Sequence, residues 1–252
     1  MNFGVFMKRN IKAVIEFDGS HYRGFQKQKK WNTTVQGVLE QAIRHTLKEK
    51  IKIYGCSRTD AGVHACNYTI SFNTDNPIPG ENLRYVTNKK LPLSIYIKSM
   101  EEAEPEFHAR HLAKKKYYIY KVLQGDRPEV FEHNYKYYFP QELDIDKMKL
   151  ALAEFVGKKD FRAFSSKNTE TTDFRRTVHE VYLTQIGNEI WFHFIGRGFL
   201  YNMLRIIAGT VLEVGTGKKD IDTIKKALET GDRNLRSKKA PAGGLYLKEV
   251  YY

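Results

Sequence analysis

The chain has 252 residues, and its 42 Lys and Arg against 29 Asp and Glu give a formal net charge of +13. This length can bury one large core or two smaller ones, and the positive excess favours a polyanionic partner, with nucleic acid first. Two cysteines exclude a disulfide framework, and no apolar run is long enough to span a bilayer. We therefore expect a cytoplasmic protein without a membrane segment. The 16 Tyr and 15 Phe favour RNA, because unpaired bases stack on aromatic rings.

The first half of the chain alternates strand-like and helix-like patterns. Residues 11–17 read as a half-buried strand, and Thr33 or Thr34 is expected to cap a helix whose apolar stripe runs to Leu47. Between them, residues 21–31 form a basic and aromatic loop that either contacts RNA or is an ordinary surface loop. Further strands are predicted over 51–54, 68–72 and 93–98, with a helix over 81–88. The order β-α-β-β-α-β is typical of ferredoxin-like domains.

The second half repeats this order in outline, without a repeat at the level of residues. The polar segment 101–110 predicts a domain boundary. We expect an α+β protein of two ferredoxin-like halves with antiparallel sheets and a cleft between them: an extension over 1–10, then domains over 11–104 and 105–252. The elements predicted in the second half are a strand over 116–122, a helix opened by Asp144 or Asp146 and ended by Gly157, a hairpin of 178–186 and 190–195, helices over 199–214 and 221–228, and a strand over 244–251.

The stretch Ser57–Ala65 collects an acid, a cation, a hydroxyl, a glycine and a histidine between two predicted strands. Such a loop on a rigid frame is either a reaction site or a surface loop with a solvated ion pair. Cys56, His64 and Cys66 are three candidate metal ligands, but no distant pair completes them. We therefore expect no metal site.

Arg205 stands in a predicted helix that is otherwise apolar nearly all round. A buried arginine is costly unless a carboxylate pairs with it, and Glu213 is too far along the same helix to do so. Asp60 is an attractive partner from another element, because an ionised carboxylate in a low-dielectric site needs a counter-charge. The alternative is that Arg205 lies on the helix surface beside an unrelated acid.

Two blocks carry a resemblance to a known family. Ser57–Ala65 resembles the signature of TruA-type tRNA pseudouridine synthases, and Gly198–Arg205 resembles their Gly-Phe-Leu-x-x-Met-x-Arg block. Further similar motifs follow in the same order along nearly the whole chain after Asn10. They are Asp18-Gly19 with Gly24-Phe25-Gln26, Thr34-Val35-Gln36-Gly37, Phe107-His108-Ala109-Arg110, Asp160-Phe161, and Ala240–Leu247.

The resemblance implies a role for five residues. Asp60 is similar to the catalytic nucleophile, and Arg205 to the arginine paired with it. Tyr118 matches the ring that stacks on the target uracil and helps to remove the C5 proton. Leu245 matches the apolar residue that lines the base pocket, and Arg58 matches an arginine that holds the flipped nucleotide. Without the resemblance, Tyr118 is interpreted as a strand residue that packs in a sheet, and Leu245 as a core leucine. The structural and functional interpretations are compatible.

The resemblance also implies the reaction and the partners. We expect an isomerase that converts uridine to pseudouridine at positions 38, 39 and 40 in the anticodon stem-loop of tRNA, working as a homodimer with tRNA across both subunits. Because the atoms are conserved in this reaction, no cofactor, ATP or metal is expected. The sequence departs from the family at Ser57, Phe25 and Asn67-Tyr68, where Gly, Trp and Gly-Gln are usual.

Three alternatives stay open at this point. The same fold can act on a different RNA, or the chain can bind RNA without catalysis. A phosphate-binding enzyme that uses Gly215-Thr216-Gly217-Lys218 is the third, although the P-loop spacing is absent. The sequence also leaves open whether Asp60 attacks the sugar C1′ or the base.

Overall fold

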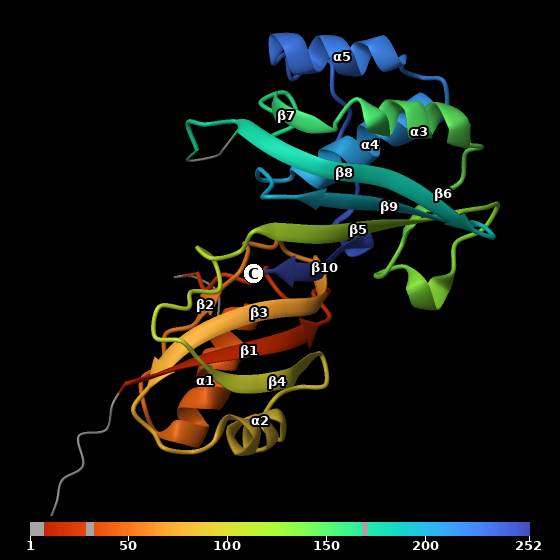
Figure 1. Cartoon of the computed structure of the whole chain (residues 1–252). Helices are drawn as coiled ribbons and strands as arrows, with labels where there is room; N and C mark the ends of the chain where they lie inside the picture. Colours follow the sequence, from red (N-terminus) through yellow and green to blue (C-terminus); the bar gives the residue numbers. More distant parts are fainter. Residues whose placement is uncertain (1–7, 29–32, 168–170) are drawn as a thin grey trace, which may run out of the picture. The chain divides into compact units, whose positions relative to one another are not determined.

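The computed structural model describes residues 8–28, 33–167 and 171–252. It is a mixed α/β protein that divides into two compact units (Figure 1). Unit 1 runs to Lys114 and includes the C-terminal segment Leu247–Tyr252, and unit 2 is Lys115–Tyr246. Within the described ranges, no helix has the length and apolar character needed to cross a membrane.

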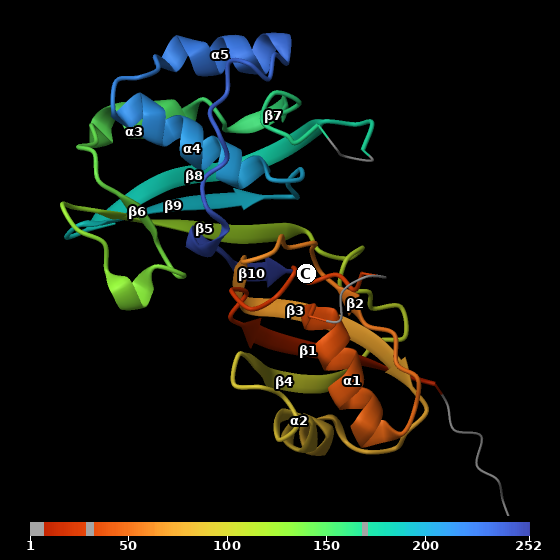
Figure 2. The same ribbon diagram turned by 180° about the vertical axis from the view of Figure 1, so that it is seen from behind.

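Unit 1 is built on an antiparallel sheet with the strand order β4-β1-β3-β2. Ile11 of β1 lies opposite Phe72 of β3 and Glu102 of β4. Figure 2 shows α1 in front of β1 and β3. The elements are β1 (Arg9–Phe17), α1 (Val35–Leu47), β2 (Tyr54–Gly55), β3 (His64–Thr74), α2 (Gly80–Asn88) and β4 (Ile95–Ala103).

The predicted cap of α1 is confirmed at Thr34, whose hydroxyl accepts a hydrogen bond from the Gly37 amide at 3.2 Å. The predicted strand over 51–54 is wrong except at its end, where β2 consists of Tyr54 and Gly55 alone. The reason lies in α1: Glu40 accepts from the Ile53 amide at 3.2 Å, and Gln36 donates to the Ile53 carbonyl at 3.0 Å. Side chains of the helix thus replace a neighbouring strand.

Unit 2 has the strand order β5-β9-β8-β7, antiparallel throughout, and β6 pairs in parallel with β5. The predicted hairpin is confirmed, because β8 and β9 meet at Gly187-Asn188. Helix α3 packs on α4, α5 and β8. The elements are β5 (Lys115–Gln124), β6 (Tyr137–Phe139), α3 (Ile145–Ala153), β7 (Gly157–Asp160), β8 (Arg175–Ile186), β9 (Glu189–Gly196), α4 (Met203–Gly215), α5 (Ile221–Thr230) and β10 (Leu245–Tyr251), whose last five residues belong to unit 1.

Two helices of unit 2 are shorter than predicted. Helix α4 begins at Met203 rather than at residue 199, because Asn202 adopts a left-handed conformation with φ 61° that a helix cannot contain. Helix α3 is capped by Asp144, which accepts from the Lys147 amide at 3.0 Å, and ends at Ala153. Gly157 therefore does not end α3, as predicted, but opens β7.

Candidate active site

The loop between β2 and β3 carries Asp60 on a tight turn. The Val63 amide donates to the Asp60 carbonyl at 3.2 Å, and Gly62 takes the positive φ of 81° that the turn requires. The Asp60 side chain is half-buried, and that of Arg58 is exposed. The turn thus holds the two predicted site residues of unit 1 in one short loop with its carboxylate partly withdrawn from water.

The segment before α1 supports this turn from its backbone side. The Phe25 amide donates to the Thr59 carbonyl at 3.2 Å. Gly24 has φ +91°, and a Cβ on it would lie 2.7 Å from the Thr59 carbonyl oxygen and 3.3 Å from the Ala61 amide nitrogen. Only glycine permits so close an approach of two main chains. The position of Asp60 is therefore set largely by backbone packing.

An aromatic pair holds the beginning of the same loop. The rings of Phe25 and Tyr68 stack with centroids 4.2 Å apart and an interplanar angle of 23°. The Tyr68 side chain is fully buried, and its hydroxyl donates to the Ser57 carbonyl and accepts from the Ser57 amide at 3.3 Å. Three residues at which the sequence departs from the family that it resembles thus form one contact cluster: Ser57, Phe25 and Tyr68.

The burial of Phe25 also bears on the basic and aromatic loop predicted over residues 21–31. Phe25 and Tyr22 are 3% and 8% exposed, so both rings belong to the core. The Tyr22 hydroxyl is hydrogen-bonded to the Ser94 hydroxyl at 2.6 Å. Both interpretations, RNA contact and an ordinary surface loop, are therefore wrong for these two rings. Residues 29–32 lie outside the described part of the chain.

His64, at the end of the loop, is hydrogen-bonded to a backbone amide. Its side chain is 3% exposed, and the Gly19 amide nitrogen lies 3.1 Å from Nδ1. An Asp18 carboxylate oxygen lies 3.2 Å from the same nitrogen. Cys56 is buried. Among the described residues, no group of three His, Cys, Asp or Glu is arranged to hold a metal ion.

Arg205 lies in the first turn of α4 in unit 2 and is 8% exposed, so the surface alternative is wrong. Its Nε donates to the Ala240 carbonyl at 2.8 Å, and its Nη1 donates to the Asn202 side-chain oxygen at 3.1 Å. The Ala240 amide donates in return to the Arg205 carbonyl at 2.9 Å. Helix α4 and the segment before β10 are thereby tied together at the arginine.

Tyr118 and Tyr120 on β5 are two residues apart, so their side chains lie on one face of the strand. Tyr118 is 6% exposed and packs edge-to-face on Phe199 with centroids 5.5 Å apart. The Tyr120 hydroxyl donates to the Pro241 carbonyl at 2.8 Å. Burial raises the pKa of Tyr120 well above its ordinary value, with the Arg205 charge acting in the opposite direction. This keeps the hydroxyl protonated and available as a donor.

Leu245, at the start of β10, is 6% exposed. The residues that precede it are held at Ala240 by Arg205 and at Pro241 by Tyr120. A Cβ on Gly244 would lie 2.8 Å from the Lys121 carbonyl oxygen, so this segment passes directly over β5. Unit 2 therefore brings its three predicted site residues, Tyr118, Arg205 and Leu245, onto neighbouring elements.

Asn202 contacts Arg205 and is not among the site residues predicted from the sequence. It is 6% exposed, has φ 61°, and its amide nitrogen donates to the Ser166 hydroxyl at 2.7 Å while its oxygen accepts from Arg205. The sequence does give one indication of it, because Asn202 is the second polar residue in the apolar helix block and lies three positions before Arg205. The left-handed backbone was not readable, although Asn tolerates it better than most residues.

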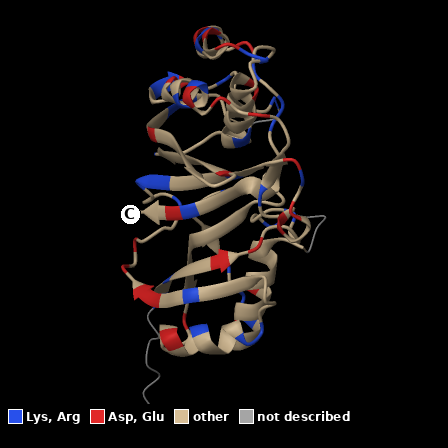
Figure 3. Ribbon diagram, turned by 90° about the vertical axis from the view of Figure 1, so that its right-hand side faces the viewer, with Lys and Arg blue, Asp and Glu red and all other residues tan. Residues whose placement is uncertain are grey.

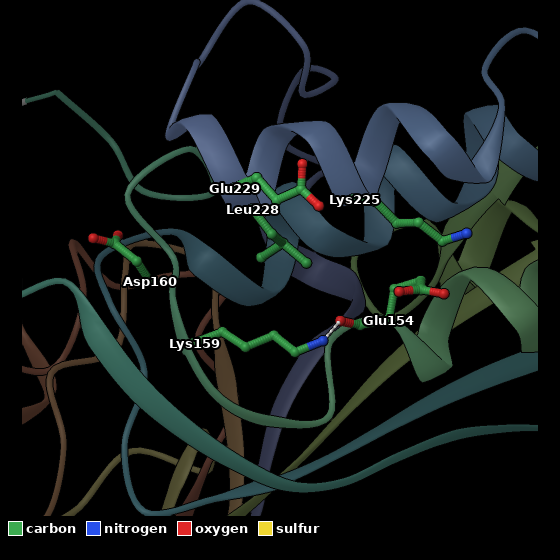
Figure 4. A pocket seen from close by; sticks show the side chains of 6 residues that line it. All are labelled: Glu154, Lys159, Asp160, Lys225, Leu228 and Glu229. Atoms are coloured by element: carbon green, nitrogen blue, oxygen red, sulfur yellow. Dashed lines mark hydrogen bonds between the residues drawn. The ribbon is translucent and has the colours of Figure 1, made fainter.

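A shallow hollow elsewhere on unit 2 has none of these residues. Acidic and basic side chains from the end of α3, from β7 and from α5 line it (Figure 4). Lys159 donates a hydrogen bond to the Glu154 carbonyl. Two of its charged groups are paired with residues beside the hollow, Asp160 with Arg162 at 3.5 Å and Lys225 with Asp222 at 3.0 Å, and it holds no predicted site residue. The lining residues are Glu154, Lys159, Asp160, Lys225, Leu228 and Glu229.

Comparison with known proteins gives one consistent result. The family described as tRNA pseudouridine synthase matches residues 13–111 and 151–252. "tRNA pseudouridine synthase A 2" of Clostridium perfringens is 42% identical over 244 residues, which are 97% of this chain and 100% of the relative. "tRNA pseudouridine synthase A" of Clostridium kluyveri is 43% identical over 97% and 100% of the two chains, and that of Geobacillus sp. is 43% identical over 98% and 99%.

Proposed function

The chain belongs to the tRNA pseudouridine synthase family, and from this premise we propose that Asp60 is the catalytic residue with which it converts uridine to pseudouridine in tRNA. The observation that carries the assignment is the Asp60 loop itself. A half-buried carboxylate stands on a turn whose backbone is held by Gly24 and Phe25, which is the preorganisation that a reacting group needs.

The reaction breaks the bond from C1′ to N1, turns the base and joins C1′ to C5. A carboxylate serves it as a nucleophile or by stabilising positive charge at the sugar, and a base must finally remove the C5 proton. The target nucleotide must leave the stack to be reached. Asp60 supplies the carboxylate, and the exposed Arg58 in the same loop holds the flipped nucleotide.

The residues of unit 2 act on the base and on the carboxylate. Tyr118 stacks on the uracil and helps to remove the C5 proton, Leu245 lines the base pocket, and Arg205 pairs with Asp60. The low exposure of all three, between 6% and 8%, supports roles in a site from which water is excluded. A double-mutant cycle of Arg205→Met and Asp60→Asn tests the pairing, since additive effects on stability contradict it.

The substrate is the anticodon stem-loop of tRNA, with positions 38, 39 and 40 as targets. The names of the relatives support tRNA as the substrate, the motif similarity supports these positions, and the net charge of +13 suits a polyanion. A pseudouridine synthase acting on a different RNA is the alternative. Incubation with unmodified tRNA and mapping of pseudouridine at nucleotide resolution distinguishes the two.

The decisive control in that assay is Asp60→Asn, which keeps the side-chain size and removes the charge. We expect a loss of turnover of at least about a thousandfold, in the upper range for a reacting group, with binding of tRNA retained. Substantial turnover by a clean preparation of the variant rejects Asp60 as the catalytic residue.

The two units are ferredoxin-like halves of a homodimeric enzyme. The order β1-α1-β2-β3-α2-β4 in unit 1 supports the first part. Unit 2 follows the same order as far as β5-α3-β8-β9-α4, with β6, β7 and α5 as additions, and holds only the first two residues of β10. Lys and Arg on strands and helices of both units support a tRNA that lies across two subunits (Figure 3). Light scattering that gives a monomer mass at concentrations of full activity contradicts the dimer.

A further inference from the structure

We propose that Arg233 and Arg236 in unit 2 form a binding site for a phosphate group of the RNA backbone. The proposal rests on the proposed function, because it takes RNA as the substrate. Both residues stand in the segment that leads from α5 to Ala240, the hydrogen-bond partner of Arg205. The residues that bind the phosphate would thus be connected by one short stretch of chain to Ala240, which is hydrogen-bonded to Arg205 of the candidate site.

Arg236 is half-buried and incompletely satisfied. Its Nη1 donates to the Ser237 carbonyl at 3.3 Å. Its Nε is buried and has no hydrogen-bond partner among the described residues. A buried N–H without an acceptor is unfavourable and rare in folded proteins, so an acceptor that arrives with a ligand would remove the cost.

Arg233 is held in one orientation by neutral acceptors. Its Nε donates to the Ser165 carbonyl and its Nη2 to the Ser165 hydroxyl, both at 3.2 Å, and Ser165 is fully buried. The guanidinium also lies over the Phe174 ring, 5.9 Å from its centroid. These contacts fix the plane of the guanidinium but provide no carboxylate partner among the described residues.

The two charges are close enough to act on each other. Burial and the neighbouring Arg233 charge both lower the pKa of Arg236. Among the described residues, no carboxylate oxygen lies within 4.0 Å of either guanidinium. By contrast, Arg162 on the same Phe174 ring has Asp160 at 3.5 Å, and Arg84 on α2 has Glu81 at 2.8 Å.

An anion is the group that satisfies all of these features at once. Two like charges that act on each other are destabilising, and a phosphate bound near both would replace this repulsion with attraction. The arginine fork suits the geometry of phosphate oxygens, because it can donate two parallel hydrogen bonds. In a tRNA-modifying enzyme, the abundant phosphate is that of the RNA backbone.

The test is the salt dependence of tRNA binding by Arg236→Gln and Arg236→Lys. Losing one phosphate contact weakens binding for every tRNA sequence and lowers the slope of log K against log salt by about 1. We expect this for Arg236→Gln, with a raised KM and an unchanged kcat. Arg236→Lys keeps the charge, so it should keep the slope while binding more weakly than the wild type. Arg84→Gln, whose arginine is already paired, is the matched control and should change neither quantity.

A slope equal to that of the wild type in folded Arg236→Gln overturns the proposal. If Arg236→Gln does not fold, Arg236→Lys decides alone: tRNA binding as tight as in the wild type then overturns it. A purely structural role would lower the melting temperature and leave the slope unchanged. Failure of the proposed function looks different, because the wild type would then bind tRNA with a steep slope and form no pseudouridine.

Discussion

The Asp60 loop of unit 1 and the Arg205 region of unit 2 are held in different ways. The loop is positioned by main-chain hydrogen bonds, by Gly24 packed against its backbone and by an aromatic stack. The arginine is positioned by side-chain hydrogen bonds to Asn202 and Ala240. A substitution in the loop should therefore act through the course of the backbone, whereas one near the arginine should act through lost donors and acceptors.

Arg205→Met should have the largest effect on stability. It removes the hydrogen bonds to Ala240 and Asn202 in a buried region, and each hydrogen bond that involves a charged group contributes about 1.5–3 kcal/mol. Urea unfolding measures the loss, and pseudouridine formation should fall with it. A urea unfolding curve equal to that of the wild type would mean that the Arg205 side chain does not contribute to stability.

Gly24→Ala should show how strongly the loop depends on its backbone. The added Cβ meets the Thr59 carbonyl and strains a positive φ, which costs about 1–3 kcal/mol. Gly187→Ala is the matched control, because Gly187 also has positive φ but no atom within 4 Å of an added Cβ. Equal losses in the two variants would show that the close approach at Thr59 is unimportant.

Asn202 variants separate its backbone from its amide. Asn202→Gly keeps the left-handed conformation and removes the amide, whereas Asn202→Ala loses both, so we expect about 1 kcal/mol more destabilisation for alanine. Both variants should lower kcat, because Arg205 loses an acceptor. Lys48→Gly, at another non-glycine residue with positive φ, controls for backbone strain alone and should leave kcat unchanged.

Tyr68→Phe should have a smaller effect, of about 1 kcal/mol, because it removes one hydroxyl that bonds the backbone of Ser57. If this hydroxyl positions the loop, kcat should fall while KM changes little. Tyr252→Phe is the control, since it removes a hydroxyl that donates to the Ala109 carbonyl in the same unit. An equal fall of kcat in both variants would indicate a general loss of stability.

His193 should give the smallest effect, through pH. Its ring nitrogens are hydrogen-bonded to the hydroxyls of Tyr117 and Thr184, the Tyr182 ring stacks on it, and burial lowers its pKa below the ordinary 6.5. The unfolded chain therefore binds a proton first, so stability should fall as pH drops below about 6.5, by at most about 1.4 kcal/mol per unit. Urea unfolding of His193→Gln should lack this part of the pH dependence. An identical slope in wild type and variant contradicts it.

The sequence predicted most of the elements and the burial of Arg205 correctly. The strand at β1, the cap at Thr34 and the β8–β9 hairpin were readable because each depends on neighbours within a few residues. The failure at residues 51–53 has a non-local cause. Residues 51–53 have the strand pattern, but Gln36 and Glu40 of α1 take the backbone hydrogen bonds of Ile53, and that competition is not local.

The sequence by itself determined the family and the candidate carboxylate, because Ser57–Ala65 and Gly198–Arg205 are contiguous motifs whose residue types and order identify them. Only the tertiary structure decided what holds these residues. Phe25 and Tyr68 are 43 positions apart and stack under the loop, and Ala240 is 35 positions from the arginine that it binds. Such contacts depend on where whole elements pack, and no local pattern of side chains encodes them.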